Sequence, residues 1–423
     1  MTRASTTPAN GRVPRATVVL AVLFTGAFVM GCAEMLVVGL IDLIAADLDV
    51  SVPSAGALVT ANAVGLAVGG PLLTFLTTAL DRRLVVLGST GVFVAANLLP
   101  ALGADYSTFL VARVLIGAVQ GLYIAAAITT ATSVVPPERA GRAMAVVISG
   151  FASASALGLP LGTVLGQAIG WRASFVAVVV IAALVLALAS MVLPSVPTAG
   201  GSRAFEQARH AFAPRVLALL ALCAVIFAAI QSVLTYVVPF LDEITHVRGS
   251  VVSAFLLTYG VATTVGSSVG GRFADAHAAR ALVVGCVGVL GSIGLMAAFG
   301  ASPILVGLAI LGMGLFGMGM APSLQHRVVT LAGPGGPLAA SLPASAVNAG
   351  IAIGSLAGGA AITVDGVGAI VTVGGLFAVA AIAIAVATLG LRVGSADEDA
   401  AAAAARASSP EVLTTSGNVE RNQ

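Results

Sequence analysis

Long apolar stretches, separated by short polar intervals, run through almost the whole chain. About 20 consecutive apolar residues are what a helix needs to cross the hydrocarbon core of a bilayer. Twelve such stretches occur, and we expect each to be a membrane-spanning helix. They cover approximately residues 16–40, 54–77, 84–103, 107–132, 142–168, 173–193, 215–240, 250–271, 280–299, 303–324, 338–362 and 367–392.

The polar intervals divide this pattern into two halves. The longest interval before the C-terminal tail is 194–214, where Pro, Gly and Ser precede a short charged stretch, as is typical of a linker. Six expected spans lie on each side of it. The sequence therefore predicts an all-α integral membrane fold of two six-helix bundles. Its segments are a cytoplasmic lead (1–14), an N-terminal bundle (15–193), a central cytoplasmic loop (194–214), a C-terminal bundle (215–393) and a disordered cytoplasmic tail (394–423).

Arginine positions predict the orientation, because cytoplasmic loops of membrane proteins carry an excess of positive charge. If the N-terminus is cytoplasmic, the outer loops contain two arginines, Arg172 and Arg248. We therefore expect both termini in the cytoplasm. The cytoplasmic ends and loops then hold Arg12, Arg15, Arg82, Arg83, Arg139, Arg142, Arg203, Arg209, Arg215, Arg272, Arg280, Arg327 and Arg392.

Composition agrees with a lipid environment. Hydrophobic residues make up 59% of the chain and charged residues 9%, against about 25% charged residues in a soluble domain. A net charge of +2 without a basic aromatic patch argues against nucleic acid as a partner. All 19 basic residues are arginine, which together with abundant Ala, Val and Gly is typical of a GC-rich bacterial genome. We expect a multi-pass protein of a bacterial cell membrane.

Enzymatic and metal chemistry find no support in the sequence. The three cysteines and four histidines have no metal-ligand spacing. The glycine-rich run Gly333-Pro334-Gly335-Gly336 lacks the pattern of a phosphate-binding loop. We expect no catalytic residues, no metal and no cofactor, and an ion gradient rather than ATP as the energy source.

One carboxylate, Glu34, lies deep in the first apolar stretch. A charged residue inside a membrane span is costly and usually faces a partner or a water-filled cavity. We interpret Glu34 as a proton carrier; the alternative is a structural acid satisfied by its neighbours. Asp42 lies eight residues on, about 12 Å along a helix. It is either a second proton-coupling acid, if the helix continues past Gly39, or an acid of the outer loop, which we favour.

Arg113 lies inside the fourth span at a depth compatible with that of Glu34. It can be an electrostatic partner of Glu34 or of a substrate, or it can extend to the outer headgroups. Other polar residues within spans are candidate substrate contacts, although interhelical hydrogen bonds are the commoner role for such residues. These candidates are Gln120, Tyr123, Gln231, Tyr236 and Asn348. Because few charged residues lie within the spans, we expect a mainly apolar cavity and a neutral or lipophilic substrate.

Several motifs, in this order, resemble the major facilitator superfamily, specifically its twelve-span drug:proton antiporters and the arabinose and chloramphenicol efflux permeases. The motifs are Ala33-Glu34-Met35 with Ile44-Ala45-Ala46-Asp47-Leu48, Arg113 with Gly117 and Gly121, Gly158-Leu159-Pro160-Leu161-Gly162, Gly271-Arg272-Phe273-Ala274-Asp275 through Arg280, and 345–359. Two features depart from the family pattern. The loop after the second span lacks the usual acidic residue, and the pair Asp42-Leu43 places an acid one position early.

The resemblance implies a monomeric, proton-coupled carrier that works by rocking of its two halves. The bent fifth span, with Gly158, Pro160 and Gly162, is explained by close helix packing, and the same contact can also seal one side during turnover. In the loop motif with Gly271 and Arg280, we predict that Asp275 faces the N-terminal end of a neighbouring helix and helps to latch the cytoplasmic side closed. Export of a small, largely apolar compound such as a phenicol antibiotic is the function that the resemblance favours. A sugar or metabolite exporter, an importer, an uncoupled facilitator and a membrane sensor without transport remain alternatives.

Overall fold

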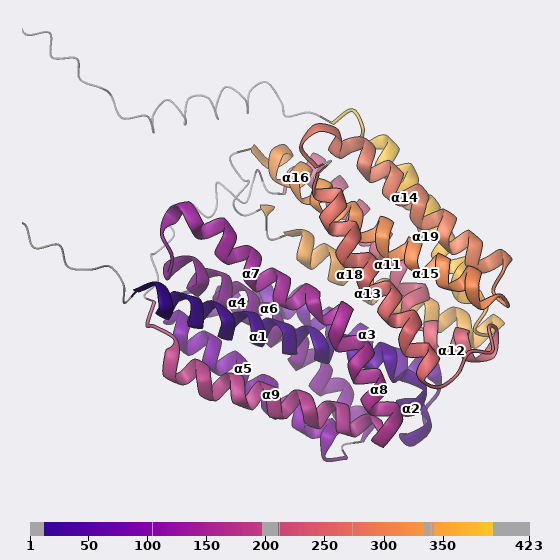
Figure 1. Cartoon of the computed structure of the whole chain (residues 1–423). Coiled ribbons are helices and arrows are strands. Elements are labelled where there is room, and N and C mark those ends of the chain that lie inside the picture. Colours follow the sequence, from indigo (N-terminus) through magenta and orange to yellow (C-terminus); the bar gives the residue numbers. More distant parts are fainter. Residues whose placement is uncertain are drawn as a thin grey trace, which may run out of the picture.

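Every element in the described part of this computed structural model is helical, and Figure 1 shows the helices as two groups joined in one chain. The structure describes residues 12–103, 105–196, 210, 212–272, 274–333, 339–340 and 342–391. The first half contains α1 (Arg12–Gly39), α2 (Ile41–Asp47), α3 (Val52–Val64), η1 (Gly65–Gly69), α4 (Gly70–Leu76), α5 (Arg82–Ala101), α6 (Tyr106–Ser133), η2 (Pro137–Arg139), α7 (Ala140–Ser153), η3 (Ala154–Gly158), α8 (Leu159–Ile169) and α9 (Trp171–Val192). The second half contains α11 (Pro214–Leu234), α12 (Val237–Glu243), α13 (Ser250–Gly271), α14 (Ala274–Ala298), α15 (Pro303–Gly319), α16 (Ala321–Ala332), α18 (Leu342–Asp365) and α19 (Ala369–Ala387).

The predicted membrane architecture is confirmed. Twelve segments within the described residues are long and apolar enough to span a bilayer, from Ala16–Gly39 to Ala369–Ala387. Residues 1–11 of the predicted N-terminal lead, most of the central loop and the C-terminal tail lie outside the described residues, and 12–14 already belong to α1.

Several spans consist of more than one helical segment. The second span changes from α-helix to π-helix over Gly65–Gly69, and the fifth does so over Ala154–Gly158. Pro71 and Pro160 lie at the start of the α-helices that follow. Because proline has no N–H to donate, the normal hydrogen-bond ladder is interrupted near it, and an inserted π-turn accommodates the change.

Each half has its own helix packing. In the first half α1 packs against α7 and α9, while α6 packs against α3, η1 and α5. In the second half α11 packs against α18 and α19, and α13 packs against α15. The approach of α6 to α3 depends on Gly117, where a Cβ atom would overlap the backbone oxygen of Asn62. This contact brings Arg113 and Gln120 of α6 against the backbones of α1 and α3.

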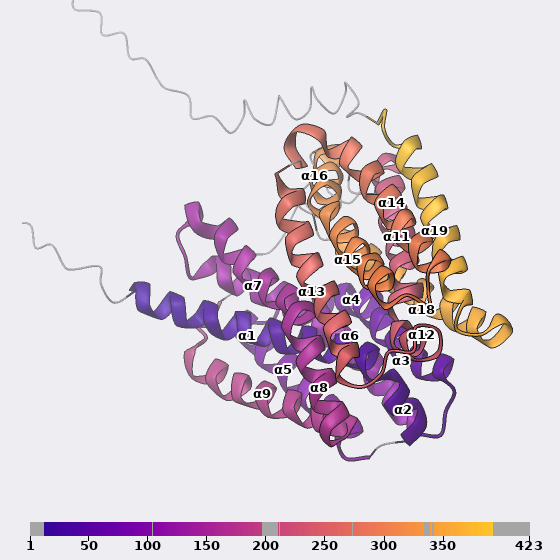
Figure 2. The same cartoon turned by 45° about the vertical axis from the view of Figure 1, so that its right-hand side comes forward.

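The two halves meet mainly at the end of the molecule that contains α2 and α12. There α3 packs against α18, η3 and α8 pack against α13, and α2 contacts α12. Both views show the ribbons of the two halves diverging toward the opposite end, where α7 of the first half and α16 of the second lie apart (Figures 1 and 2). The contact between the halves is therefore strongly asymmetric along the long axis of the helices.

Candidate functional site

Arg113 is fully buried in α6, and its guanidinium binds the backbones of two other helices. Its Nε atom donates to the backbone oxygen of Leu58 on α3 at 3.1 Å. Its Nη1 and Nη2 atoms donate to the backbone oxygens of Ala33 and Glu34 on α1 at 2.8 and 3.3 Å. The side chain has a relative exposure of 0%. Arg113 therefore joins α1, α3 and α6 and does not extend to the surface.

Glu34 lies beside this arginine, which agrees with the compatible depths of the two residues in their spans. Its side chain has a relative exposure of 6%. Within the described residues, no hydrogen bond reaches its buried Oε2 atom. Arg113 contacts the backbone of Glu34 through a hydrogen bond, so the positive charge is held next to the acid by the main chain. Glu34 is thus a buried carboxyl group beside a buried guanidinium.

A second polar layer lies one to two helical turns from the first. Gln120 on α6 donates to the backbone oxygen of Met30 at 2.6 Å, and its Oε1 atom accepts a hydrogen bond from Asn62 at 3.0 Å. Asn62 was not among the predicted polar contacts, although an amide inside the second apolar span is a signal for one. Tyr123 donates to the backbone oxygen of Leu23 at 3.1 Å. Gln120 and Tyr123 thus bind the backbone of α1.

The other predicted polar contacts lie in the second half. Gln231 donates to Thr235 at 3.0 Å within α11 and its C-cap, and Tyr236 donates to the backbone oxygen of Ser355 at 2.9 Å. Asn348 donates to the backbone oxygen of Ala344 at 2.9 Å. Its Oδ1 atom is buried and has no partner among the described residues.

Asp42 lies outside the first span. The helix α1 ends at Gly39, Leu40 has φ −126° and ψ 13°, and Asp42 falls in the first turn of the short helix α2. The condition for a second acid along one continuous helix is therefore not met. Burial raises the pKa of Asp42 to about 6, and the negative charges of Asp242 and Glu243 act in the same direction.

The predicted conformational glycines of the fifth span contact α1 within the first half. A Cβ atom at Gly158 would overlap Sγ of Cys32, and one at Gly162 would overlap the side chain of Leu36. Pro160 is buried at the start of α8. The contact of this span with the second half uses other residues, since a Cβ atom at Gly260 of α13 would lie 2.5 Å from Cα of Ala156.

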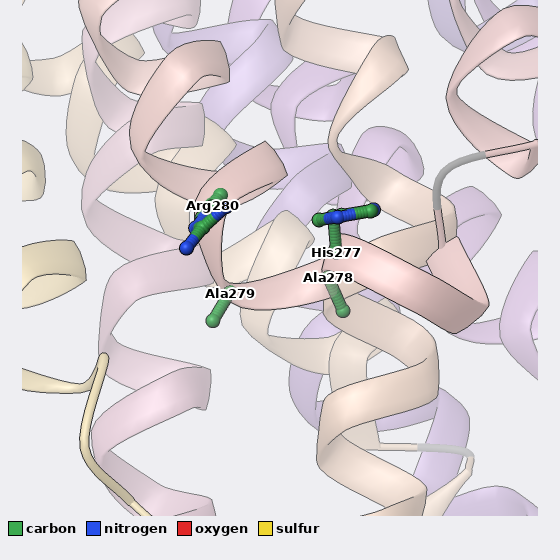
Figure 3. Close-up of a pocket in the computed structure, with 4 residues that line it drawn as sticks. All are labelled: His277, Ala278, Ala279 and Arg280. Carbon is green, nitrogen blue, oxygen red and sulfur yellow. The ribbon is translucent and has the colours of Figure 1, made fainter.

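The residues predicted to form a latch lie at the junction of α13 and α14. Gly271 ends α13, and a Cβ atom there would meet nothing within 4 Å. The side chain of Asp275 lies outside the described part of the structure. Arg280 lines a surface pocket of about 360 Å³ with His277, where α14 is kinked. Figure 3 shows Arg280 and His277 on the same side of the helix.

Metal binding has no candidate within the part of the chain that the structure describes. No group of three or more His, Cys, Asp or Glu side chains there is placed to hold a metal ion. The three cysteines are buried and unpaired by disulfides.

Curated relatives are similar to this chain over most of their length. A chloramphenicol resistance protein of Streptomyces lividans is 31% identical over 77% of this chain and 84% of the relative. A chloramphenicol efflux pump of Mycobacterium tuberculosis (strain H37Rv) is 30% identical over 85% of this chain and 89% of the relative. The inner membrane transport protein YdhP of Escherichia coli (strain K12) is 32% identical over 80% and 87%, respectively.

Solved structures have the same fold at lower sequence identity. A bacterial homologue of the human lysosomal transporter Spinster, in an inward-facing and occupied conformation, has a TM-score of 0.73 at 15% identity and covers 93% of this chain and 98% of its own. The human organic anion transporter TETRAN has a TM-score of 0.62 at 18% identity, with 88% and 99% covered. The sequence profile of the Major Facilitator Superfamily matches residues 23–325. The chain therefore belongs to the major facilitator superfamily of multi-pass membrane transporters.

Proposed function

We propose that this transporter is a proton-coupled exporter of a small, largely apolar compound, with phenicol antibiotics as the leading substrate class. The observation that carries the proposal is the buried carboxyl group of Glu34 beside the buried guanidinium of Arg113. Protons and the exported molecule would be its small-molecule partners. The protein would work as a monomer in a bacterial inner membrane with both termini in the cytoplasm.

The physical basis of the coupling is a balance between two effects on Glu34. Removal from water favours the neutral form of a carboxyl group, whereas a nearby positive charge favours the ionised form. A small change in the surroundings of the site can therefore load or release a proton. The hydrogen bonds of Arg113 support this role, because those to α1 hold the guanidinium next to Glu34 while the one to Leu58 ties it to α3. A movement of α3 relative to α1 would therefore shift the guanidinium relative to the acid.

The substrate proposal is supported by chemistry and by relatives. Few charged side chains lie within the spans, which suits a neutral or lipophilic molecule better than a multiply charged anion. Two of the relatives are named for chloramphenicol resistance or efflux. Among the polar residues expected to contact the substrate, Asn348 has an unpaired amide oxygen that could accept a hydrogen bond from a hydroxyl group of the substrate.

Everted membrane vesicles test both parts of the proposal. With an acidic interior, wild-type vesicles should accumulate chloramphenicol, and an uncoupler should abolish the accumulation. Glu34→Gln should remove uphill accumulation, because the amide cannot exchange a proton. Glu138→Gln changes an exposed glutamate outside the spans and serves as the matched control.

The outcomes separate the two parts. If Glu34→Gln accumulates the drug with undiminished dependence on the pH gradient, Glu34 is not the proton carrier. If wild-type vesicles move no chloramphenicol but do move a sugar or another compound of a panel, the substrate class is wrong while the coupling can still be measured. If no compound of the panel moves, the export proposal fails as a whole.

A further inference from the structure

A chain of hydrogen bonds joins the two halves where α3 packs against α18. The hydroxyl of Ser355 on α18 donates to the backbone oxygen of Gly56 on α3 at 3.0 Å. The phenol of Tyr236 donates in turn to the backbone oxygen of Ser355 at 2.9 Å. Gly56 belongs to the first half, whereas Ser355 and Tyr236 belong to the second. All three residues are buried.

The ring of Tyr236 fills a space that only glycines leave open. Tyr236 lies at the break between α11 and α12, with φ −112° and ψ 20°, and has a relative exposure of 1%. A Cβ atom at Gly56 would overlap its Oη and lie 2.5 Å from its Cε1 and Cζ atoms. A Cβ atom at Gly359 would lie 2.5 Å from its Oη atom. The ring is thus held between a glycine of each half.

We propose that Gly56, Ser355 and Tyr236 form a lock that holds the α2/α12 end of the transporter closed and that opens when the halves rock apart. Rocking of the halves changes the contact between α3 and α18. The hydrogen bond from Ser355 to Gly56 and the packing of the Tyr236 ring against Gly56 both cross this contact, so both must be lost when the halves separate. The lock extends beyond the proposed function, because it depends neither on the proton nor on the identity of the substrate. It also assigns Tyr236 to closure and not to the substrate wall in this state.

The contacts set the size of the expected effects. Ser355→Ala removes one neutral hydrogen bond and should change the ratio of closed to open molecules roughly two- to tenfold. Gly56→Ala also drives a methyl group into Tyr236 and should change the ratio by about tenfold or more. A second contact between the halves, between Gly260 of α13 and Ser155 of η3, should keep part of the population closed.

Spin labels on the full-length, purified transporter report the closure directly. Ile169→Cys at the end of α8 and Val364→Cys at the end of α18 place exposed labels on the two halves at the locked end. The background replaces the three buried native cysteines. Pulsed dipolar spectroscopy then gives the distance distribution without substrate or gradient. Gly88→Ala is the matched control, because a Cβ atom at Gly88 of α5 would meet nothing within 4 Å.

The lock predicts longer distances in Gly56→Ala and Ser355→Ala and an unchanged distribution in Gly88→Ala. In a Tyr236→Ala background the ring is gone, so adding Gly56→Ala should have little further effect. If Gly56→Ala fails to fold, Ser355→Ala and Tyr236→Phe each remove one hydrogen bond of the chain and carry the same test. Distributions that superimpose on the wild type in the folded variants overturn the lock, whatever the transport assays give.

Discussion

The Nη2 atom of Arg113 lies 3.3 Å from the backbone oxygen of Glu34, while the Oε2 atom of the same glutamate has no hydrogen-bond partner among the described residues. The arginine is therefore a structural anchor and an electrostatic neighbour of the acid at once. Variants that separate charge from hydrogen-bonding geometry distinguish these roles.

Arg113→Lys keeps the positive charge. The ammonium group of lysine, however, lacks the planar guanidinium fork that donates to three backbone oxygens in the wild type. We expect a loss of unfolding free energy of about 2–4 kcal/mol, because buried carbonyl groups lose donors. Thermal unfolding in detergent measures this loss. Arg172→Lys is the control, since Arg172 is partly exposed and pairs with Asp47, and it should cost at most about 1 kcal/mol. Equal melting temperatures of Arg113→Lys and wild type would contradict the anchoring role.

Gln120 and Asn62 should act as a coupled pair. Their amides share a buried hydrogen bond of 3.0 Å, so each single change to Leu leaves a polar group without its partner. We expect each to cost about 1–3 kcal/mol, and the double variant to cost less than the sum by about 1 kcal/mol. Chemical or thermal denaturation of the four proteins in the cycle gives this coupling energy. Strict additivity would show that the bond makes no net contribution.

We expect the stability of the folded protein to depend on pH through Asp42. Its pKa in the folded protein is raised from 3.8 to about 6, so the folded state holds a proton that the unfolded state releases. Its contribution to stability is therefore present below about pH 4 and is lost as the pH rises through about 6. The loss is at most about 3 kcal/mol. Between pH 4 and pH 8 the melting temperature should therefore fall less with rising pH in Asp42→Asn than in the wild type.

The control for this pH dependence is Asp49→Asn, which changes an exposed aspartate of the same region. Its melting curves should follow those of the wild type across the pH range. An Asp42→Asn variant with the wild-type pH dependence would assign the effect to other groups.

Asn348 and Asn97 form a matched pair for the substrate proposal. Each donates to the backbone oxygen four residues before it and has a buried, unpaired Oδ1 atom. Replacing either by Leu should change stability little, because an apolar group of similar size removes the unpaired acceptor. Asn348→Leu should weaken chloramphenicol binding about tenfold in equilibrium dialysis, and Asn97→Leu, in α5, should not. Equal binding by both variants would remove Asn348 from the substrate wall.

Gly117→Ala should destabilise the first half. The added methyl group would overlap the backbone oxygen of Asn62, which cannot move without displacing α3. Overpacking of this kind typically costs about 1–3 kcal/mol. Gly88→Ala, which enters open space in α5, should change the melting temperature little by comparison. A melting temperature of Gly117→Ala above that of the wild type would show that the helices can separate here.

The spans were predictable because burial in lipid imposes a simple requirement. Every backbone polar group must be satisfied within the helix and the side chains must be apolar, so length and composition are sufficient to find the twelve helices. The depth of Glu34 and Arg113 followed from their positions within two spans. Compatible depths allowed the two residues to meet without specifying a contact, and the structure joins them through the hydrogen bond from Arg113 to the backbone of Glu34.

The apolar pattern by itself determined the helical class, the number of spans and the positions of Glu34 and Arg113 inside two of them. Only the tertiary structure decided which atoms pair. It turned Arg113 toward backbone oxygens, broke the chain at Leu40 so that Asp42 falls outside the first span, and seated Tyr236 between Gly56 and Gly359. The reason is physical: local apolarity specifies that a segment enters the bilayer, whereas helix contacts depend on the packing of small residues and on hydrogen bonds between residues far apart in the chain.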